Sequence, residues 1–461
     1  MAQAAARRGV NIFDEQRPMW RTMLVFLVPL MLSNVLQAAS QTVASVWIGR
    51  LLGTASLGAM SAVFPLLFLL ISFFIGIASG GSVLIGQAFG AGNHTKVKKI
   101  AGTVLGAALY MGIAVAVIGF LVSPWILGLL ATPANILAQS DAYAKVVFLT
   151  MPVIFTYIAY TTFLRGTGDT TTPLYALIVS TLLIVVITPL FILGWFGFPK
   201  LGVVSAAVAG LFANGGAFAW LLWTLHRQNH PLKFDRETLS DMLVDWTILR
   251  TVIRIGVPTG FQIMMVSLAE IALLGFVNRF GSDATAAYGA VNQVVSYVQF
   301  PAISIGITAS IFAAQCIGAR REDKLGSVVR NAVGLNYIMG IVLVALCYVF
   351  AWDILGWFIV SERTLAIAHG LLTITLWSYV IFGNNAVLSG VMRGSGAVLW
   401  PTTISVVSIW CIEVPAAYLL MRHFGLPGVW MGYPIAFCSG LVLQFSYYEF
   451  VWKRRTHERL V

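Results

Sequence analysis

The sequence predicts an all-α membrane protein with twelve transmembrane helices in two pseudo-symmetric six-helix lobes. The chain has 461 residues, of which 59% are hydrophobic and only 10% are charged. A soluble chain carries roughly 25% charged residues. Apolar runs of about 20 residues recur from end to end, and they are continuous rather than alternating, which favours helices over a β-barrel. An internal repeat divides these runs into two equal sets.

Each apolar run is expected to be a helix because a chain inside the bilayer must satisfy its own backbone hydrogen bonds. The predicted spans are about 20–48, 56–88, 100–123, 136–162, 172–196, 202–225, 250–279, 284–316, 328–351, 365–391, 398–421 and 428–451. One long polar connector separates the sixth and seventh spans. We therefore expect an N-lobe at 1–226, a cytoplasmic inter-lobe loop at 227–246 and a C-lobe at 247–461.

The repeat has one constant offset of 228 residues. It carries "GQAFGAG" (86–92) onto "AQCIGAR" (314–320), and "FLRGTGDTTTP" (163–173) onto "VMRGSGAVLWP" (391–401). Because each half holds an even number of spans, both copies have the same orientation in the membrane. Two parallel lobes around a central cleft are typical of alternating-access secondary transport.

The net charge of +11 is explained by membrane topology rather than by nucleic-acid binding. With the spans above, 22 of the 28 lysine and arginine residues fall on the side that holds both termini. The positive-inside rule then places both termini in the cytoplasm of a bacterial inner membrane.

The sequence contains none of the usual enzyme motifs. GxxxxGK[ST], HExxH and GxSxG are all absent, and the four cysteines have no metal-ligand spacing. We therefore expect neither catalysis nor a cofactor. Without a nucleotide-binding loop, the energy for transport would come from a gradient of H⁺ or Na⁺.

Two carboxylates lie well inside predicted spans, Glu270 in span 7 and Glu413 in span 11. A charge in the bilayer is expensive, so an intramembrane carboxylate indicates a functional site. The alternative is structural: a neutral glutamic acid that donates to a nearby carbonyl, or one that faces water near a helix end. A Na⁺ ion at Glu270 and Glu413 is the one metal site that we consider.

Uncharged polar residues recur at helical spacing and predict a hydrated cavity. On any one helix they could instead bond neighbouring helices together. Methionines and aromatic residues in the same spans would suit flat apolar cations. The predicted substrate- or cavity-lining residues are Asn34, Gln37, Gln41, Gln262, Tyr288, Asn292, Ser296, Gln299 and Asn385.

The sequence resembles the multidrug and toxic compound extrusion (MATE) family in its DinF-like branch. The resemblance rests on "VPLMLSNVLQ", "GQAFGAGN", "VNRFGSDATAAYGA" and "VMRGSGAVLWP", in this order, together with the six-plus-six repeat. It implies a V-shaped pair of six-helix lobes that exports organic cations and other drugs in exchange for H⁺ or Na⁺.

The sequence departs from this family at the usual N-lobe cation site. Similar proteins carry an Asp on span 1 where this chain has Ala44, and an Asn and an Asp on span 5 where it has Ile184 and Thr188. In other relatives an Asp lies on span 10, where this chain offers Asn384 and Asn385 nearby. The family's N-lobe carboxylates therefore cannot be carried over.

The repeat suggests a coupling site in the C-lobe in place of the usual N-lobe site. The offset of 228 relates Glu270 to Thr42 of span 1, and Glu413 lies two residues before Pro415, the counterpart of Pro189 in span 5. Our hypothesis is that Glu270 and Glu413 form a C-lobe pair that exchanges a proton for substrate or Na⁺. Two carboxylates in a low-dielectric site do not both ionise easily.

The preferred function is export of a cationic, amphipathic small molecule in antiport with H⁺ or Na⁺, by a monomer embedded in membrane lipid. One alternative is a flippase for lipid-linked precursors or polysaccharides, which would need a basic cleft that these spans do not offer. Another alternative is a membrane protein that binds a ligand without transporting it.

Overall fold

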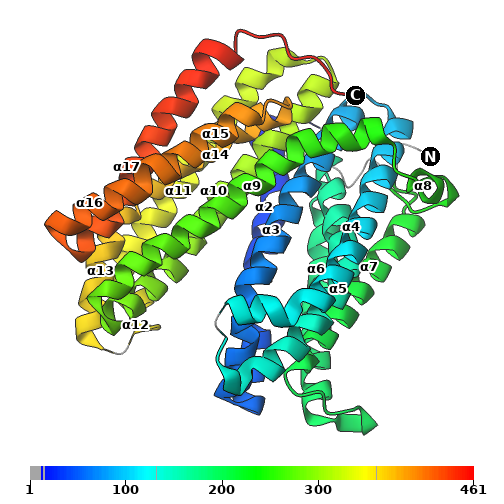
Figure 1. Cartoon of the computed structure of the whole chain (residues 1–461). Helices are drawn as coiled ribbons and strands as arrows, with labels where there is room; N and C mark the ends of the chain where they lie inside the picture. The colour runs from blue at the N-terminus through cyan, green and yellow to red at the C-terminus, as the bar shows by residue number, and fades with distance from the viewer. Residues whose placement is uncertain (1–11, 14–15, 131, 360) are drawn as a thin grey trace. The chain divides into compact units, whose positions relative to one another are not determined.

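The computed structural model describes residues 12–13, 16–130, 132–359 and 361–461, which form helices and connecting turns without a β-strand (Figure 1). The first half contains α2 (Met19–Leu52), α3 (Thr54–Gly90), α4 (His94–Leu129), α5 (Ala134–Gly166), α6 (Thr171–Leu193), η1 (Trp195–Gly197) and α7 (Val204–Arg227). The short α8 (Arg236–Asp241) follows. The second half contains α9 (Trp246–Val277), η2 (Asn278–Phe280), α10 (Ser282–Gly318), η3 (Glu322–Lys324), α11 (Leu325–Val349), α12 (Ala351–Gly356), α13 (Glu362–Thr375), α14 (Ser378–Gly394), α15 (Leu399–Val407), η4 (Ser408–Glu413), α16 (Val414–Phe424), α17 (Leu426–Tyr447) and η5 (Tyr448–Trp452).

The described helices include 11 segments that are long and apolar enough to cross a membrane, or 12 if α13 and α14 are one bent span. The chain is therefore a multi-pass membrane protein. Several helices extend beyond the apolar runs at both ends; α10, for example, has 37 residues. The predicted all-helical fold class is confirmed.

The predicted span 365–391 is broken rather than continuous. Its two halves, α13 and α14, are bent by 45°. At the break the Tyr348 hydroxyl of α11 donates to the Thr373 carbonyl at 3.1 Å and accepts from the Trp377 N–H at 3.2 Å. An inserted side chain of this kind replaces backbone hydrogen bonds and allows a helix to kink.

The predicted span 398–421 is also irregular, because α15 and α16 are joined by the π-helical turn η4. Pro415 follows this turn at the start of α16 and has no backbone N–H. In a regular α-helix the carbonyl of Cys411 would therefore lack its donor, and a widened turn avoids the clash with the proline ring. Glu413 is the last residue of the π turn.

The chain divides into two compact units. Among the described residues, unit 1 comprises Val28–Phe89 and Asn93–Gly256. Unit 2 comprises Gly90–Gly92, Val257–Val461 and the described residues up to Leu27. The inter-lobe loop belongs to unit 1. The lobe boundaries at 226 and 247 stay predictions from the sequence.

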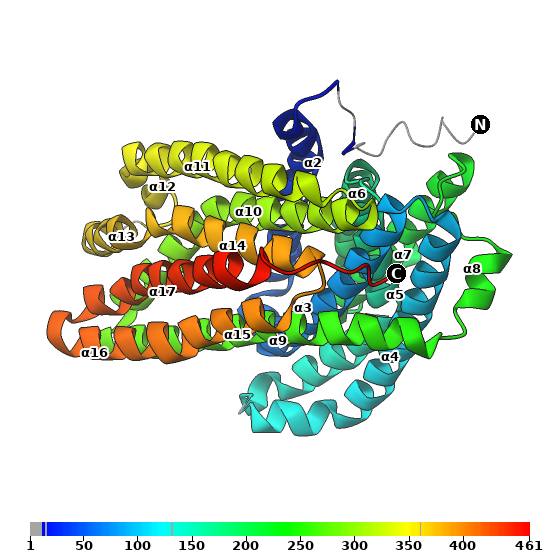
Figure 2. The same ribbon diagram turned by 90° about the horizontal axis from the view of Figure 1, so that it is seen from above.

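Each unit is a bundle of closely packed helices. In unit 1, α4 packs against α5, and α7 packs against both α5 and α6. In unit 2, α10 packs against α11, α13 and α14, while α17 packs against α14 and α16 (Figure 2). A buried hydrophobic cluster of unit 2 includes Tyr288, Tyr379, Trp430 and Tyr433, so the polar ends of three tyrosines lie inside this bundle.

The inter-lobe loop is docked on α4 within unit 1. A Cβ atom built on Gly106 would lie 2.3 Å from the Met242 carbonyl oxygen, so only glycine permits this approach. The Lys98 ammonium group pairs with Asp235 at 2.7 Å and with Glu237 at 2.9 Å. These contacts hold the loop and α8 along the first turns of α4.

Candidate functional site

The Glu270 carboxylate lies among aromatic hydroxyls inside unit 2. Its Oε2 atom accepts a hydrogen bond from the Tyr288 hydroxyl at 2.8 Å and from the Tyr433 hydroxyl at 2.9 Å. The three residues come from α9, α10 and α17. None of the described side chains donates a hydrogen bond to Oε1, which leaves that oxygen able to take up a proton or contact a cation.

Aromatic packing holds the two tyrosines in place. The Tyr288 and Trp430 rings lie 5.1 Å apart, and the Trp430 and Tyr433 rings lie 6.0 Å apart. Tyr288 is 6% exposed and Tyr433 is 3% exposed. Asn292 lies one helical turn beyond Tyr288 on α10. A rigid aromatic wall of this kind fixes where the donors point.

Glu413 supplies a second carboxylate to the same bundle. It is 4% exposed and lies within electrostatic range of Glu270. The backbone of α17 passes close to it, since a Cβ atom on Gly432 would lie 3.1 Å from the Glu413 carbonyl oxygen. In the described part of the chain, no side-chain hydrogen bond reaches the Glu413 carboxylate.

The two carboxylates have no basic partner. Among the described residues, neither Glu270 nor Glu413 forms an ion pair with Lys, Arg or His, and only tyrosines and the other carboxylate act on them electrostatically. A buried uncompensated charge is costly in a low-dielectric interior. The site can therefore be neutralised by a proton or by a cation from outside the chain.

The site does not form a metal centre of three or more acidic, Cys or His ligands, as far as the described residues show. Two carboxylates, phenolic oxygens and an amide are hard oxygen ligands, which suit a proton or an alkali cation better than a transition metal.

Residues 29–190 and 258–419 match the model of the MatE family. The chain belongs to the MatE family. The two matched segments have equal length and fall in the two halves of the chain, in agreement with the internal repeat. Members of this family are transporters, so this MatE chain is a membrane transporter and not an enzyme, as the sequence predicts.

The similarity to its relatives extends over almost the whole length of the chain. The chain is 51% identical over 444 residues to "Probable multidrug resistance protein YoeA" of Bacillus subtilis (strain 168), covering 96% of each protein. It is 26% identical to "Probable multidrug resistance protein YpnP" of the same organism, covering 94% of this chain and 96% of that protein. In fold it is similar to the Vibrio cholerae MATE transporter VcmN in the bent form, with a TM-score of 0.85, 20% identity and coverage of 94% and 97%.

The remaining predicted C-lobe residues of this MatE chain are spread over the helices α9, α10 and α14. The Asn385 amide donates to the Phe437 carbonyl at 3.0 Å, whereas its Oδ1 atom is buried with no described partner. Ser296 bonds with the Asn292 carbonyl at 2.8 Å within α10. Gln262 accepts from Thr402 at 3.4 Å, which joins α9 to α15. Gln299 is partly exposed on α10. Their role as a substrate lining stays a prediction.

The predicted N-lobe stripe of this MatE chain lies on α2. Asn34 is partly exposed, whereas Gln37 and Gln41 are exposed, and all three belong to unit 1. Thr188, where similar proteins carry an Asp, is fully buried on α6, and its hydroxyl has no partner in the described part of the chain.

Sequence reasoning missed Tyr433 as part of the site. It lies in "WMGYPIAF" in the last span, and the hydrophobic run around it gave no reason to prefer it over other aromatic residues. The available signal was its hydroxyl, because a tyrosine inside a span needs a hydrogen-bond partner and a carboxylate elsewhere in the bundle can supply one.

Proposed function

We propose that this MatE transporter exports drugs in antiport with H⁺ or Na⁺, and that Glu270 and Glu413 are its coupling carboxylates. The observation that carries this proposal is a pair of carboxylates in one helix bundle, Glu413 buried and Glu270 partly buried, with tyrosine donors at Glu270 and no basic partner among the described residues. The printed names of the relatives, which are probable multidrug resistance proteins, support the substrate class.

The proposed coupling step is competition for one acidic site. Glu270 is held by two hydroxyls on Oε2, so its Oε1 atom is available to a proton, to Na⁺ or to a cationic substrate. Glu413 is within electrostatic range, so occupancy of one carboxylate changes the charge felt at the other. Because an occupant can act only through its differential affinity for two states, exchange of occupants would drive alternating access.

The rest of the proposal follows from the composition of the site and from the sequence. The substrate would be a cationic amphipathic molecule, because an acidic site lined by Tyr and Trp suits cation–π contacts. The charge distribution supports a bacterial inner membrane with both termini in the cytoplasm. A monomer in membrane lipid remains the expected state, with no cofactor.

The test is transport in proteoliposomes that contain the full chain. Efflux of a fluorescent organic cation, ethidium, is measured under an imposed pH gradient without Na⁺, and then under a Na⁺ gradient at fixed pH. We expect one of the two gradients to drive efflux by the wild type, which names the coupling ion. Glu270→Gln and Glu413→Gln should each reduce gradient-driven efflux to the level of protein-free liposomes.

Asp353→Asn is the matched control, because Asp353 is an exposed carboxylate of unit 2 on α12, away from the site. It should transport at the wild-type rate. Normal gradient-driven efflux in both glutamate variants would return Glu270 and Glu413 to structural roles. Absence of efflux in the wild type under either gradient would contradict cation export itself.

A further inference from the structure

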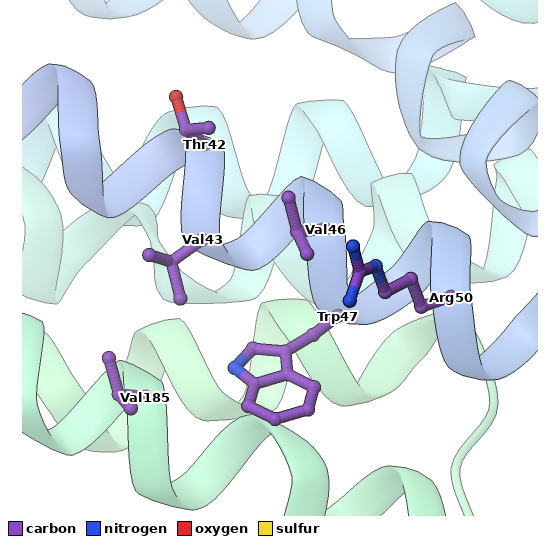
Figure 3. A pocket seen from close by; sticks show the side chains of 6 residues that line it. All are labelled: Thr42, Val43, Val46, Trp47, Arg50 and Val185. Carbon is purple, nitrogen blue, oxygen red and sulfur yellow. The ribbon is translucent and has the colours of Figure 1, made fainter.

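A second candidate site lies in unit 1, where a cavity of about 290 Å³ opens between α2 and α6 (Figure 3). It is lined by Thr42, Val43, Val46, Trp47 and Arg50 of α2 and by Val185 of α6. Figure 3 shows the five α2 side chains in a row, with Thr42 at one end, Arg50 at the other, and the Trp47 indole reaching toward the helix that carries Val185. The volume is close to the lower end of small-molecule sites.

The cavity occupies the position that corresponds, through the internal repeat, to the acidic site of unit 2. The offset of 228 residues relates Thr42 to Glu270 and Val185 to Glu413. Both carboxylates of unit 2 are thus replaced by uncharged residues in unit 1. In addition, Arg50 stands where unit 2 has Asn278. The charge of the corresponding site is therefore reversed.

Two hydrogen-bond donors line this cavity, one buried and one exposed. The Trp47 Nε1 atom is buried and has no partner among the described residues. Arg50, in the last turn of α2, is exposed at the edge of the cavity and forms no ion pair with any described acidic side chain. Both groups can only donate. Buried polar groups normally have a partner, so a missing acceptor at Trp47 points to one supplied by a ligand.

We propose that this cavity binds an amphipathic anion. Its anionic group, a carboxylate or phosphate, would pair with the Arg50 guanidinium, which suits planar two-point recognition. An oxygen of the ligand would accept from Trp47 Nε1, and its apolar part would contact Val43, Val46 and Val185. An anionic lipid and a water-soluble amphipathic acid share this chemistry. The inference is independent of the acidic site, because no residue is common to both.

The test uses two probes with the same fluorophore and opposite charge, dansylglycine and dansylcadaverine. The full chain is placed in phosphatidylcholine nanodiscs, and binding is followed by energy transfer from tryptophan to the dansyl group, with empty nanodiscs subtracted. We expect dansylglycine binding to depend on Arg50. Dansylcadaverine, which the acidic site of unit 2 would accept, is the control probe, and its binding should not depend on Arg50.

Three variants test whether the loss of binding is specific to the two hydrogen-bond donors of the cavity. Arg50→Gln should weaken dansylglycine binding by about tenfold, and Trp47→Phe, which keeps an aromatic ring, by about fivefold. Arg279→Gln, which removes another arginine near the end of a span but outside the cavity, should change it by less than about twofold. Unchanged dansylglycine binding in Arg50→Gln, or an equal loss of binding for both probes in that variant, would overturn the proposal.

A final arm identifies the source of the anion. Part of the phosphatidylcholine is replaced by phosphatidylglycerol, and the dansylglycine affinity of the wild type is compared with that of Arg50→Gln. A loss of affinity that is larger in the wild type indicates competition by the anionic lipid. An equal change in both proteins indicates a water-soluble amphipathic acid as the occupant. Either result is consistent with the site and names its ligand.

Discussion

The Tyr433 hydroxyl donates a 2.9 Å hydrogen bond to Oε2 of Glu270, although 163 residues separate the two in the chain. Tyr288 donates to the same oxygen from a third helix at 2.8 Å, and the two hydroxyls lie 3.5 Å apart. The intramembrane carboxylate is therefore fixed by donors from both ends of the C-terminal half. This arrangement gives Glu270 a defined orientation before any ion or substrate binds.

A double-mutant cycle on these donors should show strong coupling. Tyr288→Phe and Tyr433→Phe each remove one hydrogen bond to a charged group, which costs about 1.5–3 kcal/mol. Because both hydroxyls share one acceptor, the double variant should depart from additivity by about 0.5 kcal/mol or more. Thermal unfolding in detergent measures the cycle. Tyr337→Phe, an exposed tyrosine on α11, is the control, and purely additive losses would mean that the donors act independently.

The docked inter-lobe loop should be sensitive to any side chain at Gly106. A Cβ atom there would lie 2.3 Å from the Met242 carbonyl oxygen, so Gly106→Ala must push the loop away from α4. Overpacking of this kind costs about 1–3 kcal/mol. Limited proteolysis should cut the loop of the variant faster, and its melting temperature should fall. Gly128→Ala on the same helix, which meets no atom within 4 Å, should behave like the wild type.

Acidification should loosen the loop through His230. Burial lowers the pKa of His230 and nearby Asp169 opposes this, while His230 Nδ1 accepts from the Leu232 N–H at 3.1 Å and is therefore unprotonated. A base with a lowered folded-state pKa binds more protons when released, so stability falls as the pH drops through about 6.5.

The melting temperature should therefore fall between pH 7.5 and pH 5.5, and His230→Gln should reduce this fall. Asp235 does not contribute in that window. Its partial burial opposes ionisation, but the hydrogen bonds from Lys98 and Thr238 prevail and lower its pKa to about 2. Its stabilising effect is lost only as the pH falls through that value. The same pH dependence in His230→Gln would assign the effect to other groups.

Asn336 should stabilise unit 2 as a link between helices. Its amide group donates to the Val380 carbonyl and to Asn384 Oδ1, both at 2.9 Å, which joins α11 to α14. Asn336→Ala should lower the free energy of unfolding by about 1 kcal/mol, as is usual for such bonds between membrane helices. Asn331→Ala, whose amide bonds only within its own helix, should cost less. Equal melting temperatures for the two variants would argue against this role.

The sequence predicted best what depends on local pattern. The long apolar runs identify the spans. The break between α13 and α14 was not predicted, because it depends on a hydrogen bond from Tyr348 to the carbonyl of Thr373, 25 residues further along the chain. The π turn before Pro415 had a partial signal in the proline itself. Asn384, which was noted as a polar residue near the usual site, is bonded to Asn336.

By itself, the sequence determined that this chain is a multi-pass helical transporter with an internal repeat and two carboxylates inside its spans. It could do so because hydrophobic length, residue spacing and the cost of a buried charge are properties of short segments. Only the tertiary structure decided that Tyr288 and Tyr433 meet at Glu270, and that a cavity with Arg50 occupies the corresponding place in unit 1. Such contacts depend on how helices far apart in the chain pack. An apolar span can pack against many different helices, and the hydrogen bonds of its few polar side chains select among them.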